Sequence, residues 1–217
     1  VRLNESAFGA HDVRVVSSKL NLSSRLVDLG EVAPAETLAT EVIEIARKHL
    51  GPRHPSVADA LVLLALLQFD RSNFNESVEF NAEAIDIYEE AAGAVNLRRA
   101  TALANQARSY VKIDNLALAE QRYRDALDLR AQVQGVTHPQ TLLAAGNLAN
   151  MLIRRGRYSE ALAEFRRILA HRIDQVGADH QSLAAVILSE ACALGTLGRL
   201  TEARARFTRA FRLAEQG

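Results

Sequence analysis

Five glycines recur every 42 residues along this chain of 217 residues: Gly9, Gly51, Gly93, Gly135 and Gly177. A fixed period of this length is typical of a repeat array, in which one small unit stacks on copies of itself. Neighbouring units of such an array bury a core between them. The period therefore predicts the repeats 9–50, 51–92, 93–134, 135–176 and 177–217, and it favours binding over catalysis.

Each repeat is predicted to hold two helices. Counted from its glycine as offset 0, apolar residues follow the helical i, i+3, i+4, i+7 spacing at offsets 10, 14 and 17 and again at 26, 30, 33 and 34. Helix A is expected over about offsets 4–20 and helix B over about offsets 24–40. Between them, offset 21 holds a small or turn-forming residue in every repeat, namely Gly30, Ser72, Asp114, Gly156 and Gly198.

Two further offsets predict details of the helices. Offset 26 holds a small residue in every repeat, which predicts that helices approach closely there: Ala35, Ser77, Ala119, Ala161 and Ala203. Offset 3 holds a histidine in three repeats, His54, His138 and His180. Proline follows two of them at the position preferred for the first turn of a helix. We therefore expect these histidines to be N-caps of helix A.

The pattern resembles the tetratricopeptide repeat, in the 42-residue form similar to kinesin light chain. The segment from Gly135 to Gly177 carries it best, with "HP", "NLA" and "GRYSEALAEF" in GVTHPQTLLAAGNLANMLIRRGRYSEALAEFRRILAHRIDQVG. The usual tryptophan of helix A is absent. The resemblance implies an all-α fold, a right-handed α–α superhelix or solenoid of five helix-turn-helix units. It extends over 1–217 as a single domain, with 1–8 as the end of a preceding repeat.

The resemblance also implies a ligand-binding concave face lined by the A helices, at offsets 8, 12, 15 and 19. In the third and fourth repeats these offsets gather amides and cations, the donors that hold a carboxylate by charge-assisted hydrogen bonds. A chain-terminal carboxylate and an internal Asp or Glu of the partner would serve equally. The candidate peptide-binding residues are Asn105, Arg108, Lys112, Asn147, Asn150 and Arg154.

A secondary acidic and apolar groove is predicted in the second repeat, from Asp59, Leu63, Leu66, Phe69 and Asp70. The hypothesis is that an extended peptide lies along the concave face. Its acidic part would meet the third and fourth repeats, and its basic or apolar part would meet the first two.

Composition excludes several other classes of function. The 26 basic and 26 acidic residues balance, and aromatic residues are scarce among the arginines of the fourth repeat, so no nucleic acid partner is expected. No apolar run reaches the roughly 18 residues of a membrane span. The single cysteine, Cys192, rules out an internal disulfide and favours the cytoplasm. We expect it to be a partly buried structural thiol.

No catalytic residue, metal site or cofactor is expected. The three histidines lie in different repeats instead of converging as metal ligands do. No phosphate-binding glycine loop or nucleophile elbow occurs. The sequence therefore predicts a non-catalytic scaffold that binds a protein or peptide and is one module of a larger protein.

Two alternatives remain. The array could be a regulatory sensor arm of a kinase, a nucleotide-driven switch, a transcription regulator or a caspase-like effector. It could also assemble end to end. Residues 1–93 carry 8 basic and 15 acidic residues, a balance of −7, whereas residues 94–217 carry 18 and 11, a balance of +7. At the far end we expect Phe207, Phe211 and Leu213 to be partly uncovered.

Overall fold

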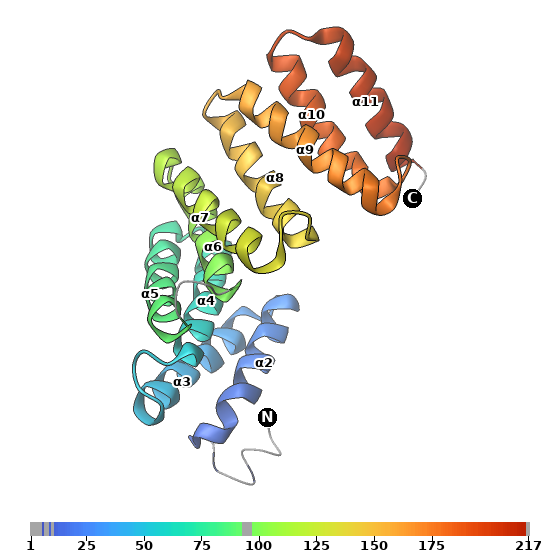
Figure 1. The fold of residues 1–217 in the computed structure, drawn as a ribbon. Helices are drawn as coiled ribbons and strands as arrows, with labels where there is room; N and C mark the ends of the chain where they lie inside the picture. The colour runs from blue at the N-terminus through green and yellow to red at the C-terminus, as the bar shows by residue number, and fades with distance from the viewer. Residues whose placement is uncertain (1–5, 7–8, 10, 93–96, 216–217) are drawn as a thin grey trace. The chain divides into compact units, whose positions relative to one another are not determined.

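The computed structural model describes residues 6, 9, 11–92 and 97–215, which lie in helices or in the short connections between them (Figure 1). The predicted all-α class is confirmed. The chain divides into two compact units, Val1–Leu129 and Arg130–Gly217, and each is described by itself. The prediction of one continuous solenoid stays a prediction. The expected remnant of a preceding repeat at 1–8 lies almost wholly outside the described residues.

The first unit contains three A helices and the B helices between them. A short 3₁₀ turn, η1 (Val13–Val15), leads into the elements α2 (Val16–Asp28), α3 (Val32–His49), α4 (Pro55–Asp70), α5 (Phe74–Ala92), α6 (Leu97–Lys112) and the start of α7 (Leu116–Gln134). From α2 to α6 each helix packs against the next, and the A helices α2, α4 and α6 also contact one another in order. The A and B helices therefore form two layers around one core.

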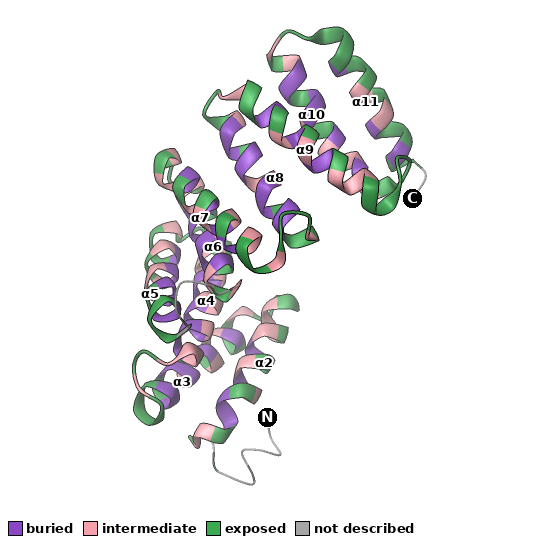
Figure 2. Ribbon diagram, in the orientation of Figure 1, coloured by how far each residue is buried: buried purple, intermediate pink, exposed green. Residues whose placement is uncertain are grey.

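The second unit repeats this arrangement. It contains α8 (Pro139–Arg154), α9 (Tyr158–Val176), the 3₁₀ turn η2 (Gln181–Leu183), α10 (Ala184–Thr196) and α11 (Leu200–Ala214). Each helix packs on its successor, and α8 also contacts α10. Each predicted repeat thus holds one helix pair, with ends within a few residues of the predicted offsets. Figure 2 shows the buried positions distributed along α8, α9 and α10, whereas α11 is largely exposed.

The turn between the two helices of each repeat has a left-handed residue at offset 21, as its sequence predicted. Positive φ angles of 59° to 75° occur in all five repeats, at Gly30, Ser72, Asp114, Gly156 and Gly198. Glycine adopts this conformation without strain, whereas a residue with a side chain does not. Two of the five turns are therefore strained.

The three histidines cap the following helical segment as predicted. The Nδ1 atoms of His54 and His138 each accept a hydrogen bond of 3.2 Å from the backbone N–H two residues later. His180 does the same at 3.1 Å. In each case the ring satisfies one of the N–H groups that a helix start leaves unpaired.

Close approach at the small residues is also confirmed. Ala35, Ser77 and their equivalents at offset 26 are all buried. The buried hydroxyl of Ser23 on α2 donates to the Ala35 carbonyl on α3 at 2.8 Å, and Ser77 on α5 donates to the Ala65 carbonyl on α4 at the same distance. Both bonds join the same two offsets, with donor and acceptor exchanged between the helices.

The expectation for the end of the chain is partly wrong. Phe211 is exposed and Phe207 is half-buried, but Leu213 is fully buried. Leu213 lies on the opposite side of α11, where it packs with Leu169, Leu183 and Ile187. The inner face of α11 is therefore complete, and only its outer face is uncovered.

Candidate functional site

Positions predicted to face a ligand line a pocket in the first unit. The pocket encloses about 410 Å³, and its walls come from the A helices and their N-terminal turns. From α2 it takes offsets 8, 11, 12 and 15, and from α4 it takes Asp59 and Leu63 of the predicted secondary groove. The full lining is Ser17, Leu20, Asn21, Ser24, Ser56, Asp59, Leu63 and Arg98. Hydroxyl, amide and charged groups therefore share this pocket with two leucines.

Both carboxylate oxygens of Asp59 are already bonded. The hydroxyl of buried Tyr88 on α5 donates to Oδ1 at 2.7 Å, and Arg98 on α6 donates to Oδ2 at 3.1 Å. Burial raises the pKa of Tyr88 well above its usual range, and the charge and hydrogen bond of Asp59 raise it further. A basic ligand that approached Asp59 would have to compete with Arg98.

The predicted cations of α6 lie against aromatic rings. The Arg108 guanidinium is 4.4 Å from the centroid of the Phe69 ring, and Lys112 Nζ is 6.0 Å from that of Phe74. Both cations are exposed, and neither forms an ion pair with any residue that the structure describes. Asn105 lies one turn before Arg108 on the same helix and is half-buried.

The aromatic contact links the two predicted sites. Phe69 was assigned to the secondary groove, yet it supports a cation of the peptide-binding set. The two rings meet edge to face, with centroids 5.3 Å apart and planes inclined at 64°. Leu66 is half-buried and Asp70 is exposed at the end of α4. Arg108, Lys112, Phe69 and Phe74 are called the cation–aromatic platform below.

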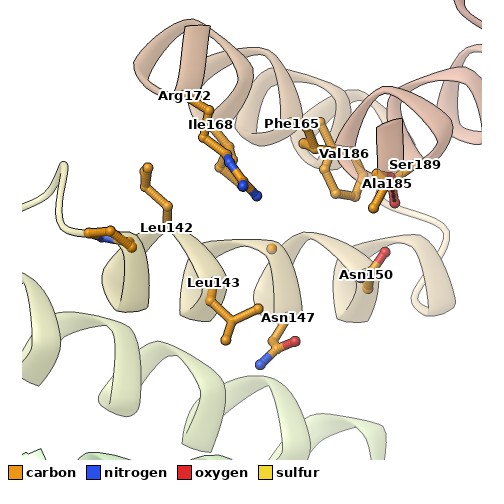
Figure 3. A pocket seen from close by; sticks show the side chains of 12 residues that line it. Leu142, Leu143, Asn147, Asn150, Phe165, Ile168, Arg172, Ala185, Val186 and Ser189 are labelled. Carbon is orange, nitrogen blue, oxygen red and sulfur yellow. Dashed lines mark hydrogen bonds between the residues drawn. The ribbon is translucent and has the colours of Figure 1, made fainter. Parts of the chain in front are cut away.

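A second pocket, of about 170 Å³, lies in the second unit between α8, α9 and α10 (Figure 3). Its polar groups include Asn147 and Asn150, both predicted, together with Ser189 at an equivalent offset of α10. Figure 3 shows Asn150 directed toward Ser189, whereas Leu143 and Asn147 extend from the opposite side of α8. The predicted Arg154 ends α8 and does not line this pocket, whose cation is Arg172 of α9.

Sequence reasoning missed Tyr88 and Arg172, which occupy offset 37 of helix B in the second and fourth repeats. Both reach pockets lined mainly by A helices. Alignment of the repeats could have identified both residues. Offset 37 holds buried Ala46 in the first repeat, but large side chains with polar groups in the second and fourth.

Cys192 was expected to be partly buried, and this is wrong: it is exposed, because offset 15 lies on the open side of α10. Within the described ranges, no group of three or more His, Cys, Asp and Glu side chains could hold a metal ion. None of the described helices is both long and apolar enough to cross a membrane.

Comparisons with known proteins agree with this architecture. The family model of the tetratricopeptide repeat matches residues 14–90, 98–173 and 140–216. The TPR-like repeats of a candidate kinesin light chain from Podosopora anserina superpose with a TM-score of 0.81 at 22% identity, covering 94% of this chain and 96% of that one. BtubC from P. vanneervenii gives 0.83 at 21% identity, with 94% and 81% covered.

A third similar structure is YrrB, described as a TPR protein with an unusual peptide-binding site. It has a TM-score of 0.60 at 15% identity and covers 91% of this chain and 85% of its own. A comparison with curated proteins gives no match. The family model matches nearly the whole chain. The helix pairs of this chain, the turns between them and the histidine N-caps lie within the matched segments. The chain belongs to the tetratricopeptide repeat family.

Proposed function

We propose that this chain is a protein- or peptide-binding scaffold in which the A helices contact the ligand. The main support is that the same offsets of successive A helices line a pocket in each unit. Offsets 8 and 12 contribute Ser17 and Asn21 in the first unit and Ala185 and Ser189 in the second. Stacked helices hold such positions rigidly, which lowers the cost of ordering the receptor when a ligand binds.

The cation–aromatic platform is proposed to receive an acidic group of the ligand. Arg108 and Lys112 lie one turn apart on an exposed face of α6. Stacking on Phe69 covers one face of the guanidinium and leaves its N–H edge for a carboxylate, which guanidinium binds in bidentate fashion.

The pocket of the second unit is proposed to bind ligand main chain. Asn150, which is directed toward Ser189, offers an amide donor and a carbonyl acceptor, and a peptide group needs both. Val186 of α10 adds apolar surface to the same pocket. Arg154, at the end of α8, would add a second cation for an acidic ligand.

The test is a peptide array probed with the purified 217-residue chain. Acidic peptides of about ten residues, which extend over about 33 Å, are paired with copies in which Asn and Gln replace Asp and Glu. We expect the acidic member of each pair to bind better. The strongest binder is then measured in solution with Arg108→Glu and with Arg154→Glu, each expected to weaken binding about tenfold or more.

Lys48→Glu is the matched control, because Lys48 is an exposed cation near the end of α3. It should leave binding unchanged. Equal binding of acidic and neutral peptides, or unchanged affinity in Arg108→Glu, would contradict the assignment of the anion-binding residues.

A further inference from the structure

A glycine lies in the middle of α8 although the fold does not require one there. Gly146 is the eighth of the 16 residues of α8, and its φ angle is outside the left-handed region. Apart from the backbone of its own helix, a Cβ atom at this position would have no other atom within 4 Å. In a helix interior glycine lowers stability relative to alanine. Gly146 therefore destabilises α8, and no structural role offsets this.

The missing side chain of Gly146 opens the pocket of the second unit. Gly146 occupies offset 11 of its repeat and lines this pocket, which encloses about 170 Å³. In the first two repeats the same offset holds Leu20 and Val62, which form part of the pocket walls there. The other glycine in a described helix, Gly195, is the last residue but one of α10 and does not line the pocket. Only Gly146 therefore leaves open a space that a side chain would occupy in this pocket.

The floor of this pocket is apolar. It consists of Leu142, Phe165 and Ile168, which are 3%, 1% and 3% exposed, and half-buried Val186 of α10 forms part of the wall. A peptide group placed against these side chains would lose its hydrogen bonds to water without replacing them. An apolar protein cavity of about 150 Å³ accommodates a benzene ring. The pocket therefore suits one large apolar side chain better than it suits main chain.

The cation of this pocket has no counter-charge. Arg172 of α9 is half-buried, and Figure 3 shows the nitrogen-bearing end of its side chain directed from α9 toward α8. Arg166 and Arg167 on the same helix pair with glutamates. The Arg172 side chain, in contrast, forms no ion pair or hydrogen bond with any residue that the structure describes. Because a guanidinium forms charge-assisted hydrogen bonds with a carboxylate, Arg172 is suited to an acidic group of a ligand.

We infer that this pocket binds one large apolar side chain of a peptide ligand, the size of leucine or phenylalanine, next to an acidic residue that pairs with Arg172. Gly146 determines this specificity, because a side chain at its position would occupy the space that the ligand needs. Asn150 and Ser189, toward the other end of the pocket, remain for the ligand main chain. This specificity rests on the proposed function, in which the same pocket contacts the ligand.

Hydrocinnamate, a phenyl ring on a short chain that ends in a carboxylate, is a probe for the pocket alone. It is titrated into the isotopically labelled 217-residue chain, and amide NMR spectra measure its affinity. We expect it to shift resonances of α8, α9 and α10 with a Kd of about 1–10 mM, as is typical of a ligand of this size. Its neutral amide should bind about threefold to fivefold more weakly, because it forms no ion pair with Arg172. Propionate, which lacks the ring, should not bind.

Two variants separate the contribution of the cavity from that of the charge. Gly146→Leu should weaken hydrocinnamate binding about tenfold or more, since its side chain fills the space that the ring needs. Arg172→Gln should bind hydrocinnamate and its amide equally. Gly195→Leu is the matched control, because it makes the same substitution in the next A helix, at a glycine that also has open space beside it and lies outside the pocket. It should retain the wild-type affinity.

Gly146→Ala tests whether the fold itself requires this glycine. Thermal denaturation followed by circular dichroism should give a higher midpoint than that of the wild type, because the added Cβ meets open space and alanine favours a helix. A lower midpoint would overturn the inference, since Gly146 would then have a structural role that explains its presence.

The strongest acidic peptide from the array then separates this inference from the proposed function. Replacing its large apolar residue beside the acidic residue with alanine should weaken binding to the wild type about tenfold, but should have no effect on binding to Gly146→Leu. If the original peptide binds Gly146→Leu and the wild type equally, the scaffold function stands and the pocket assignment is wrong. A wild-type chain that does not respond to about 20 mM hydrocinnamate would also overturn the pocket assignment. Binding of hydrocinnamate without binding of any peptide would contradict the proposed function instead.

Discussion

The guanidinium of Arg108 on α6 lies over the ring of Phe69 on α4, with Cζ 4.4 Å from the ring centroid. The ring therefore supports a cation from the neighbouring A helix and limits the orientations of its planar group. An exposed cation–aromatic contact of this kind contributes about 0.5–1 kcal/mol. Phe69 is consequently expected to act on ligand binding through Arg108, without contributing any charge itself.

Replacing Phe69 with leucine should weaken binding of the acidic peptide selected on the array by about twofold to fivefold, the affinity equivalent of that contact. The net charge is unchanged, so binding of the neutral peptide should not change. Phe74→Leu should have a smaller effect, because Lys112 lies 6.0 Å from that ring. Fluorescence anisotropy titration measures both variants, and wild-type affinity in Phe69→Leu would show that the stacking does not position Arg108.

The strained turns predict that two substitutions increase stability. Ser72 and Asp114 have φ angles of 65° and 59°, whereas glycine occupies the same offset in the other three repeats. The left-handed conformation costs a residue with a side chain about 1–2 kcal/mol, and glycine avoids this cost. Glycine also makes the unfolded chain more flexible, which offsets about 0.5–1 kcal/mol of that gain in stability. Ser72→Gly should therefore raise the free energy of unfolding by about 0.5–1 kcal/mol.

Thermal denaturation followed by circular dichroism measures this change. Gly156→Ser is the reciprocal substitution, at a φ of 73° with open space around the position, and it should lower the midpoint by a similar amount. A lower midpoint for Ser72→Gly would mean that the serine side chain contributes more than the strain costs.

The period explains which parts of the fold the sequence could predict. Glycines, histidine caps and small residues act through backbone conformation and close packing, which recur identically in each repeat. Lys19 and Glu190 are different, because each is a buried charge at an offset where other repeats hold leucine, such as Leu61 and Leu148. Lys19 pairs with Glu41 of its own repeat, and Glu190 pairs with Arg166 of the preceding repeat and Arg206 of its own. Such pairs are particular to one place in the array, so the average pattern does not identify them.

The candidate site shows the same division. The resemblance to the tetratricopeptide repeat implied offsets 8, 12, 15 and 19 of helix A, and residues at offsets 8, 12 and 15 line both pockets, whereas none at offset 19 does. It could not reveal that Asp59 is bonded to Tyr88 and Arg98, because those partners come from offset 37 of α5 and offset 5 of the next repeat. The acidic character expected of this groove is therefore reduced by contacts between neighbouring helices.

Glu190 on α10 allows a test of how much a buried carboxylate contributes to stability at an offset where other repeats hold leucine. It is fully buried, 3.1 Å from Arg166 on α9 and 3.0 Å from Arg206 on α11. Both arginine side chains are partly exposed, so water can solvate them if the carboxylate is removed. Replacing a buried ion pair with a well-packed apolar residue is often neutral or stabilising, and the second and fourth repeats hold leucine at this offset.

Glu190→Leu is therefore expected to change the free energy of unfolding by no more than about 1 kcal/mol. Glu190→Ala leaves a cavity in addition and should cost about 2–4 kcal/mol. Chemical denaturation of the two variants beside the wild type gives the comparison. If leucine were as damaging as alanine, the carboxylate itself would be essential to the contact between α9, α10 and α11.

The buried phenol of Tyr88 makes stability depend on alkaline pH. Burial, together with the negative charge and hydrogen bond of Asp59, raises the pKa of Tyr88 far above its usual range, whereas Arg98 lowers it only in part. In the unfolded chain a tyrosine ionises near pH 10. The stabilisation is therefore fully present below about pH 10 and is lost as the pH rises above it, since only the unfolded chain can then release the proton.

Subtracting the phenolate absorbance of Tyr88→Phe from that of the wild type isolates this residue among the four tyrosines. We expect the Tyr88 signal to appear only together with loss of helical circular dichroism. The Tyr88→Phe variant should be less stable at neutral pH by about 1 kcal/mol, because Asp59 loses a hydrogen bond, and its stability should fall less steeply above pH 10. A Tyr88 phenolate that forms near pH 10 in the folded protein would contradict a closed Tyr88–Asp59 contact.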